Sequence, residues 1–164
     1  MMLAIMIAAL AGPMAAPAPV PARSPLAVAI AIHPKARIAP AAAIDQPALA
    51  AALARQLEAV GIAVAETDAS QRLRVTIMLV DTAGGTPLSR MATIAAYSQI
   101  LDAGGGIDPS PLATRAASCR AAAPRAADNE GRAGVQRALA RCIDQLSARI
   151  ADDVVRFRKT RLVN

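Results

Sequence analysis

Two cysteines are the residues whose types and positions most clearly predict a covalent contact. Cys119 lies in a segment rich in Ala and Arg, and Cys142 lies on the apolar stripe of a predicted C-terminal helix. In an oxidising compartment these thiols can form a disulfide that attaches the segment to the helix. In the alternative interpretation, Cys142 is a small core residue and Cys119 is an exposed thiol. With one distant histidine, the pair does not provide the closely spaced ligands of a zinc site.

His33 is the only histidine, and it lies between Ile32 and Pro34 at the predicted end of a strand. A catalytic histidine needs a nucleophile or an orienting carboxylate close to it in space, and no G-x-S-x-G motif is present to supply one. Most of the aspartates occur where helices begin or the chain turns, which are their ordinary structural positions. Asp152 and Asp153 lie within the predicted C-terminal helix, where they can form ion pairs with Arg156 and Arg149. We therefore predict no catalytic, cofactor-binding or metal-binding residue.

The first 22 residues predict a leader for export. They carry no charged side chain, and the apolar run Met1–Ala11 is followed by Gly12, Pro13 and small residues that suit a cleavage site. The run is shorter than a membrane-spanning helix requires and has the length of a signal-peptide core. We expect residues 1–22 to be a signal peptide or leader and the protein to be periplasmic or secreted. The alternatives are anchoring in the inner membrane by an uncleaved leader and a buried segment of a cytosolic protein.

Composition predicts one domain, residues 23–164, with an aliphatic core. The chain of 164 residues has one Phe, one Tyr and no Trp, and its net charge is +6. A basic protein can bind nucleic acid, anionic lipid or an acidic polymer. The arginines are scattered and no aromatic side chains are placed to stack on bases, so we expect no nucleic-acid partner.

Hydrophobic periodicity predicts the elements of this domain. Apolar residues alternate with alanine over Leu26–Ile32, which indicates a strand that Pro34 ends. A helix over about 46–60 begins after Asp45 and ends at Gly61. In the next predicted strand, RLRVTIMLVD, one face carries Leu73, Val75, Ile77 and Leu79, and the other carries Arg72, Arg74 and Thr76.

The second half of the chain contains one ambiguous segment and one long helix. Residues 87–102 suit a strand paired with the preceding one, or alternatively a helix beginning at Thr86-Pro87. Residues 103–127 are rich in Gly, Pro, Ala, Ser and Arg, which predicts a flexible connector. A helix then runs from Asp128 or Asn129 to about Arg158. The predicted fold is a two-layer α+β domain in the order β-α-β-β-α, with a small, mostly antiparallel sheet and its helices on one face.

The order of LAVAIAI, DQPALAAALARQLEAVGIAV, RLRVTIMLVD, YSQILDAGGG and the closing helix resembles small periplasmic auxiliary domains. Examples are the N-terminal domain of the translocation protein TolB and the penicillin-binding-protein activator lipoproteins. The resemblance covers about residues 26–158 and implies action by protein contacts in the envelope, without catalysis. The sequence lacks the lipid-anchoring cysteine of the lipoprotein members, and no contact residue can be transferred from them.

The leading hypothesis is a non-catalytic, exported cell-envelope protein that binds a partner protein or assists assembly. Its expected contact surface is the polar sheet face with Arg72, Arg74 and Thr76, or an edge strand. A second hypothesis is binding of an anionic envelope polymer or lipid head group by the arginines of the connector and its flank. These are Arg115, Arg120, Arg125 and Arg132. A third is a small hydrolase in which His33 contacts a Ser, a Cys or a carboxylate. The sequence does not specify the partner's identity or the oligomeric state.

Overall fold

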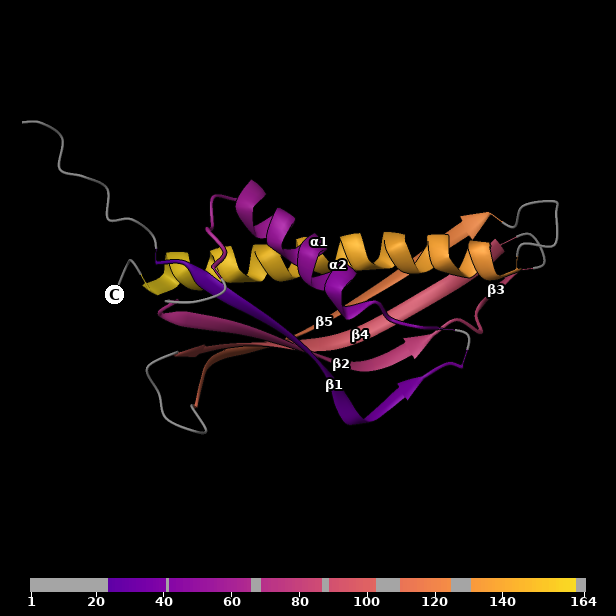
Figure 1. The fold of residues 1–164 in the computed structure, drawn as a ribbon, viewed down its shortest axis with the longest axis horizontal. Coiled ribbons are helices and arrows are strands. Elements are labelled where there is room, and N and C mark those ends of the chain that lie inside the picture. The colour runs from indigo at the N-terminus through magenta and orange to yellow at the C-terminus, as the bar shows by residue number, and fades with distance from the viewer. Residues whose placement is uncertain are drawn as a thin grey trace, which may run out of the picture.

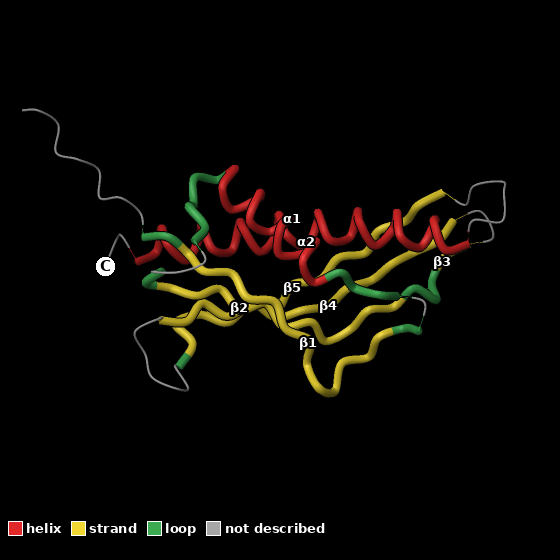
Figure 2. The backbone as a smooth tube through the Cα atoms, viewed as in Figure 1, coloured by secondary structure: helices red, strands yellow, loops and turns green. Residues whose placement is uncertain are grey.

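The computed structural model describes residues 24–40, 42–65, 69–86, 89–102, 110–124 and 131–161. In chain order its elements are β1 (Leu26–Ile38), α1 (Gln46–Ala59), β2 (Gln71–Asp81), β3 (Gly85–Thr86), β4 (Ser89–Asp102), β5 (Pro111–Pro124) and α2 (Gly131–Arg161). A twisted sheet forms one layer, and both helices lie on the same face of it (Figure 1 and Figure 2). The predicted α+β class and two-layer arrangement are therefore confirmed. The predicted leader, residues 1–22, lies outside the described residues.

The sheet is mixed, with β1 and β5 as its outer strands. β1 pairs with β2 in parallel, β2 pairs with β4 antiparallel, and β5 pairs antiparallel with the other side of β4. The short β3 pairs with the start of β4. Parallel neighbours need a crossover connection, and α1 supplies it between β1 and β2.

The predicted start and end of α1 are confirmed in atomic detail. The Asp45 side chain accepts a hydrogen bond from the Ala48 backbone N–H at 3.0 Å, which caps the first turn. Gly61 adopts φ +78° just after the helix, a conformation that residues with a side chain rarely adopt. The chain then extends, and Val64 forms a parallel bridge with Leu26 of β1. This bridge covers the beginning of one outer strand.

β1 is longer than predicted, because it continues past Pro34 to Ile38. The pairing with β2 shifts register between Ile32 and Arg37, so the proline falls within an irregular stretch of an outer strand. A proline removes one backbone donor, which is tolerated where that strand edge has no partner. The prediction that Pro34 ends the strand was therefore wrong.

β2 follows the predicted alternation up to Ile77 and then changes face. A register shift between Ile77 and Leu79 places Val80, instead of Leu79, among the buried residues. A bulge adds one residue to a strand and reverses the side-chain alternation beyond it, so periodicity alone cannot place residues after it. Thr76 also differs from expectation: it lies on the face without helices, yet only 5% of it is exposed.

The ambiguous segment is a strand: β4 covers Ser89–Asp102 and pairs on both sides, and the helical alternative was wrong. The flexible-connector prediction was wrong for residues 111–124, which form β5. Composition hid this strand because small side chains form most of its inner face. Cys119, Ala121 and Ala123 are all at most 5% exposed beneath α2. Apart from Ser110, which precedes β5, the remainder of the predicted connector, 103–109 and 125–127, lies outside the described residues.

The long C-terminal helix is confirmed and extends to Arg161, and its predicted start at Asp128 or Asn129 lies outside the described residues. Its 31 residues correspond to a length of about 46 Å, similar to that of the 14-residue strands β4 and β5. Its apolar stripe packs on those strands and on α1. The largest fully buried side chains of the two helices are Leu49, Leu53, Leu57, Leu146 and Ile150.

Candidate functional site

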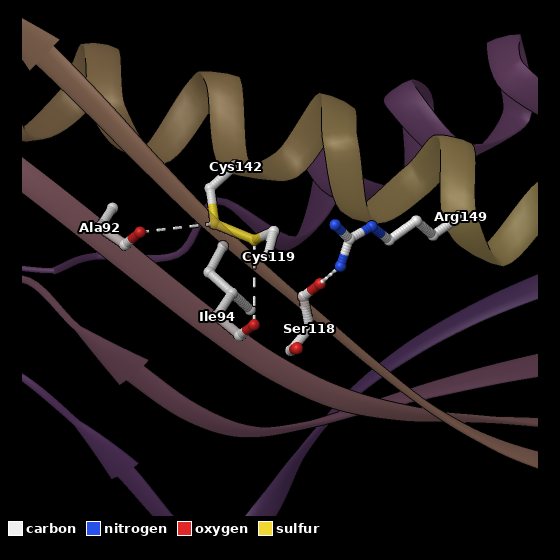
Figure 3. The surroundings of a disulfide bond; sticks show 6 residues. All are labelled: Ala92, Ile94, Ser118, Cys119, Cys142 and Arg149. Atoms are coloured by element: carbon white, nitrogen blue, oxygen red, sulfur yellow. Dashed lines mark hydrogen bonds between the residues drawn. A yellow bond between two sulfur atoms is a disulfide. The ribbon is translucent and has the colours of Figure 1, made fainter.

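The predicted disulfide is confirmed, and it attaches β5 to α2. Cys119 and Cys142 are bonded, their Cα atoms are 5.4 Å apart, and neither residue is more than 2% exposed. In Figure 3 the bond lies between the helix and the sheet, with each sulfur 3.8 Å from a carbonyl oxygen of β4, that of Ile94 or Ala92. Strand β5 is thus held beneath the helix at one point near its centre.

Two arginines of α2 reach over the outer edge of β5. The Arg141 guanidinium donates from Nη1 to the carbonyl oxygen of Ala122 at 3.0 Å, and Arg149 donates to the carbonyl oxygen of Ser118. Figure 3 shows the Arg149 contact beside the disulfide. Outer strands present unpaired backbone groups that could pair with another chain, and native proteins commonly cover them. The second half of this edge is therefore occupied by the protein's own side chains.

The first half of the edge borders a groove. A hollow of about 580 Å³ lies between the beginning of β5 and the C-terminal half of α2. Apolar side chains of Ile100, Leu112, Val154 and Phe157 contribute to its wall. A second hollow, of about 290 Å³, adjoins it further along β5. The two share three residues, Ala116, Asp153 and Arg156. We call this combined feature the β5–α2 groove.

The groove forms because a straight helix crosses a twisted sheet and because one inner position of β5 carries a large polar residue. The inner-face register of β5 runs Ala113, Arg115, Ala117 and Cys119, opposite β4 residues from Ile100 to Ile94. Arg115 is exposed, although Ser98, its partner on β4, is 5% exposed. Since a guanidinium cannot be buried without a partner, this position keeps the helix and strand apart. Arg115 and Arg156 supply positive charge to the groove, and Asp152 and Asp153 supply negative charge.

The structure separates the arginines of the predicted contact surfaces. Arg72 and Arg74 are exposed on the sheet face that carries no helix. Thr76 shares that face, but its neighbours in register, Ala31 and Tyr97, leave it buried. The predicted sheet surface therefore has two accessible arginines at one end and a closely packed centre.

The arginines expected to act together in a connector do not form one patch. Since β5 is a strand, Arg115 and Arg120 point to opposite faces of the sheet, because their separation is an odd number of residues. Arg120 donates to the sulfur of Met91 on the face without helices. Arg132 is exposed in the first turn of α2, and Arg125 lies outside the described residues.

His33 does not form the contacts that the hydrolase hypothesis requires. Its Nδ1 accepts a hydrogen bond from the backbone N–H of Lys35 at 3.1 Å, within the same outer strand. Within the described ranges, no Ser, Cys or carboxylate hydrogen-bonds to this ring. Among the same described residues, no group of three or more His, Cys, Asp or Glu side chains is placed to hold a metal ion.

Sequence reasoning missed the groove and its residues on α2. From the sequence, Arg149, Asp153 and Arg156 have only roles on the helix surface, as ion-pair partners or, for Arg156, beside the negative end of the helix dipole. The available signal was their position beside the apolar stripe that contains Cys142: a residue flanking a stripe lies at the rim of the packed face. Recognising β5 as a strand attached to that stripe would have placed these residues at its edge.

The comparisons support the fold and no closer relationship. No protein-family model matches the sequence, and no curated protein matches it. The chain is similar to the crystal structure of a Xanthomonas campestris protein of DUF330, with a TM-score of 0.64 and 16% identity over 89% of this chain and 94% of that one. It is also similar to a minor lipoprotein from Acinetobacter baumannii, with a TM-score of 0.57 and 15% identity over 83% and 93% of the two chains.

At such identities the likeness shows the fold alone. The resemblance to the TolB N-terminal domain and to penicillin-binding-protein activators stays a prediction. In the part of the chain that the structure describes, no helix has both the length and the apolar character to cross a membrane.

Proposed function

We propose that this protein is a non-catalytic cell-envelope protein, exported to the periplasm or beyond, that binds a partner protein in the β5–α2 groove. The observation that carries the proposal is the groove itself: an apolar wall with arginines and aspartates at its rim, beside a strand edge. Protein-binding sites combine a central apolar anchor region with a polar surround in the same way.

Two further observations support an envelope location. The disulfide has both sulfurs buried, and structural disulfides persist in oxidising compartments. One of the structures that share this fold is named a lipoprotein. The predicted leader and the resemblance to periplasmic auxiliary domains point the same way. The anionic-polymer hypothesis has less support, because its arginines lie on different faces.

The proposal is tested by photocrosslinking in the native envelope fraction. A photoreactive amino acid placed at Arg156 or Thr160 should give the same crosslinked partner, since both residues are exposed and line the groove. The matched control position is Arg72, which is also an exposed arginine but lies on the opposite face of the sheet. Equal crosslinking to the same partner from Arg72 would contradict the groove as the binding site.

The location is tested on the same material. Intact-mass measurement should show a chain without its leader and two hydrogens lighter than the reduced form. A full-length chain with both thiols free, recovered from the cytoplasm, would contradict export.

A further inference from the structure

We infer that the partner enters the groove as an extended segment that adds a strand to the first half of β5 and carries an acidic side chain on its groove-facing side. This inference rests on the proposed function and specifies how binding occurs. Three features support it: the direction of the backbone groups of β5, the arginine contacts, which among the described residues cover only half of the edge, and the charges in the groove.

The backbone direction follows from the contacts of Arg141 and Arg149. They reach the carbonyl oxygens of Ala122 and Ser118, so these residues direct their backbone groups away from β4. Outward and inward backbone groups alternate along an antiparallel strand. The β4–β5 register is continuous over residues 113–124, so Thr114 and Ala116 also direct their N–H and C=O groups outward.

The two halves of this edge differ in availability. At Ser118 and Ala122, guanidinium groups already occupy the outward carbonyls, and the nearby disulfide holds the strand against α2. At Thr114 and Ala116 the edge borders the groove, and both residues are exposed. An added strand can therefore pair at Thr114–Ala116 and would have to displace two arginines to continue further. This limits the paired segment to a few residues.

The groove specifies the chemistry of the segment. Alternate side chains of an added strand face the helix layer, where the partly exposed Phe157 offers an apolar surface in front of the buried Val154. Arg115, on the inner face of β5, lies between the two outward-facing residues and can donate paired hydrogen bonds to a carboxylate. In the described part of the groove, three arginines (Arg115, Arg149 and Arg156) outnumber the two aspartates Asp152 and Asp153. The whole chain also carries a net charge of +6, and both balances favour an acidic partner over a basic one.

The experiment uses short fluorescent peptides and the disulfide-bonded protein as recovered from the envelope fraction. The probe has Thr at every second position, with Val and Glu alternating between them; the control peptide has Lys in place of Glu. Measured by fluorescence anisotropy, the Glu peptide should bind at least about tenfold more tightly than the Lys peptide. Reversing the charge at this position with Arg115→Glu should remove the difference in affinity between the two peptides. Equal affinity of the two peptides, or no binding of either at millimolar concentration, would overturn the inference.

Strand pairing is tested with a matched pair of proline variants. Ala116→Pro removes an outward N–H on the open half of the edge, whereas Ala122→Pro removes one on the covered half; both alanines are exposed. Ala116→Pro should weaken peptide binding about tenfold or more, and Ala122→Pro should leave it unchanged. Equal effects of the two variants would exclude pairing at Thr114–Ala116.

Amide exchange on the unaltered protein gives a measurement that does not depend on the folding of the variants. Saturating Glu peptide should slow exchange of the Thr114 and Ala116 N–H groups, and unchanged rates would refute strand addition. Photocrosslinks from the Arg156 position that persist in the Ala116→Pro protein would retain the groove as the partner site. That result would remove only the strand-pairing inference, so the two proposals can fail separately.

Discussion

Reduction of the Cys119–Cys142 disulfide should lower the free energy of unfolding substantially. The bond joins residues 23 positions apart. In the chain-entropy description, closing a loop of this length restricts the unfolded chain by about 3.4 kcal/mol at room temperature. The oxidised and reduced forms of the chain differ by only two hydrogen atoms. The difference between their free energies of unfolding therefore reports the effect of the disulfide itself.

The assay is urea unfolding followed by far-ultraviolet circular dichroism, with and without a phosphine reductant. With a urea dependence of about 2 kcal/mol per molar, the midpoint should fall by about 1.7 M. A variant with both Cys119→Ala and Cys142→Ala should be less stable still, since it also loses two buried sulfur atoms from the core. A shift below about 0.3 M would refute the chain-entropy reasoning for this bond.

Hydrogen exchange shows where the tether acts. Because β5 pairs on one side only, reduction should accelerate exchange in β5 more than in β2, which has partners on both sides. Uniform acceleration across the sheet would mean that the bond stabilises the whole fold without a particular effect on the edge that borders the groove.

Further expectations concern single positions. Asp45→Ala should lower the free energy of unfolding by about 1 kcal/mol in denaturant titrations, because it removes the cap on the Ala48 N–H. Ser147→Ala should raise it by about 1 kcal/mol in the same titrations, since the Ser147 hydroxyl is fully buried and has no hydrogen-bond partner among the described residues; a fall would indicate a bridging group. Leu146→Ala should lower it by about 2–5 kcal/mol. Arg149→Ala, which uncovers the Ser118 carbonyl, should increase self-association in sedimentation velocity relative to Arg132→Ala.

The sequence by itself determined the elements whose residues repeat with a clear period. These predictable features are the apolar stripes of α1 and α2, the strand β2 and the helix cap at Asp45. They could be predicted because periodic aliphatic side chains and capping groups determine structure only a few residues away along the chain. The disulfide was also foreseeable, since a chain with two cysteines allows only one intramolecular bond.

Only the tertiary structure decided the identity of β5, the length of β1 and the location of the groove. Alanine carries little periodic signal, so the inner face of β5 became recognisable only where Cys119 and its neighbours pack beneath α2. Pro34 is tolerated because β1 is an outer strand, a fact set by pairing between distant segments. The groove depends on sheet twist, on the straight course of α2 and on Arg115 at one register position, and these meet only after the chain has folded.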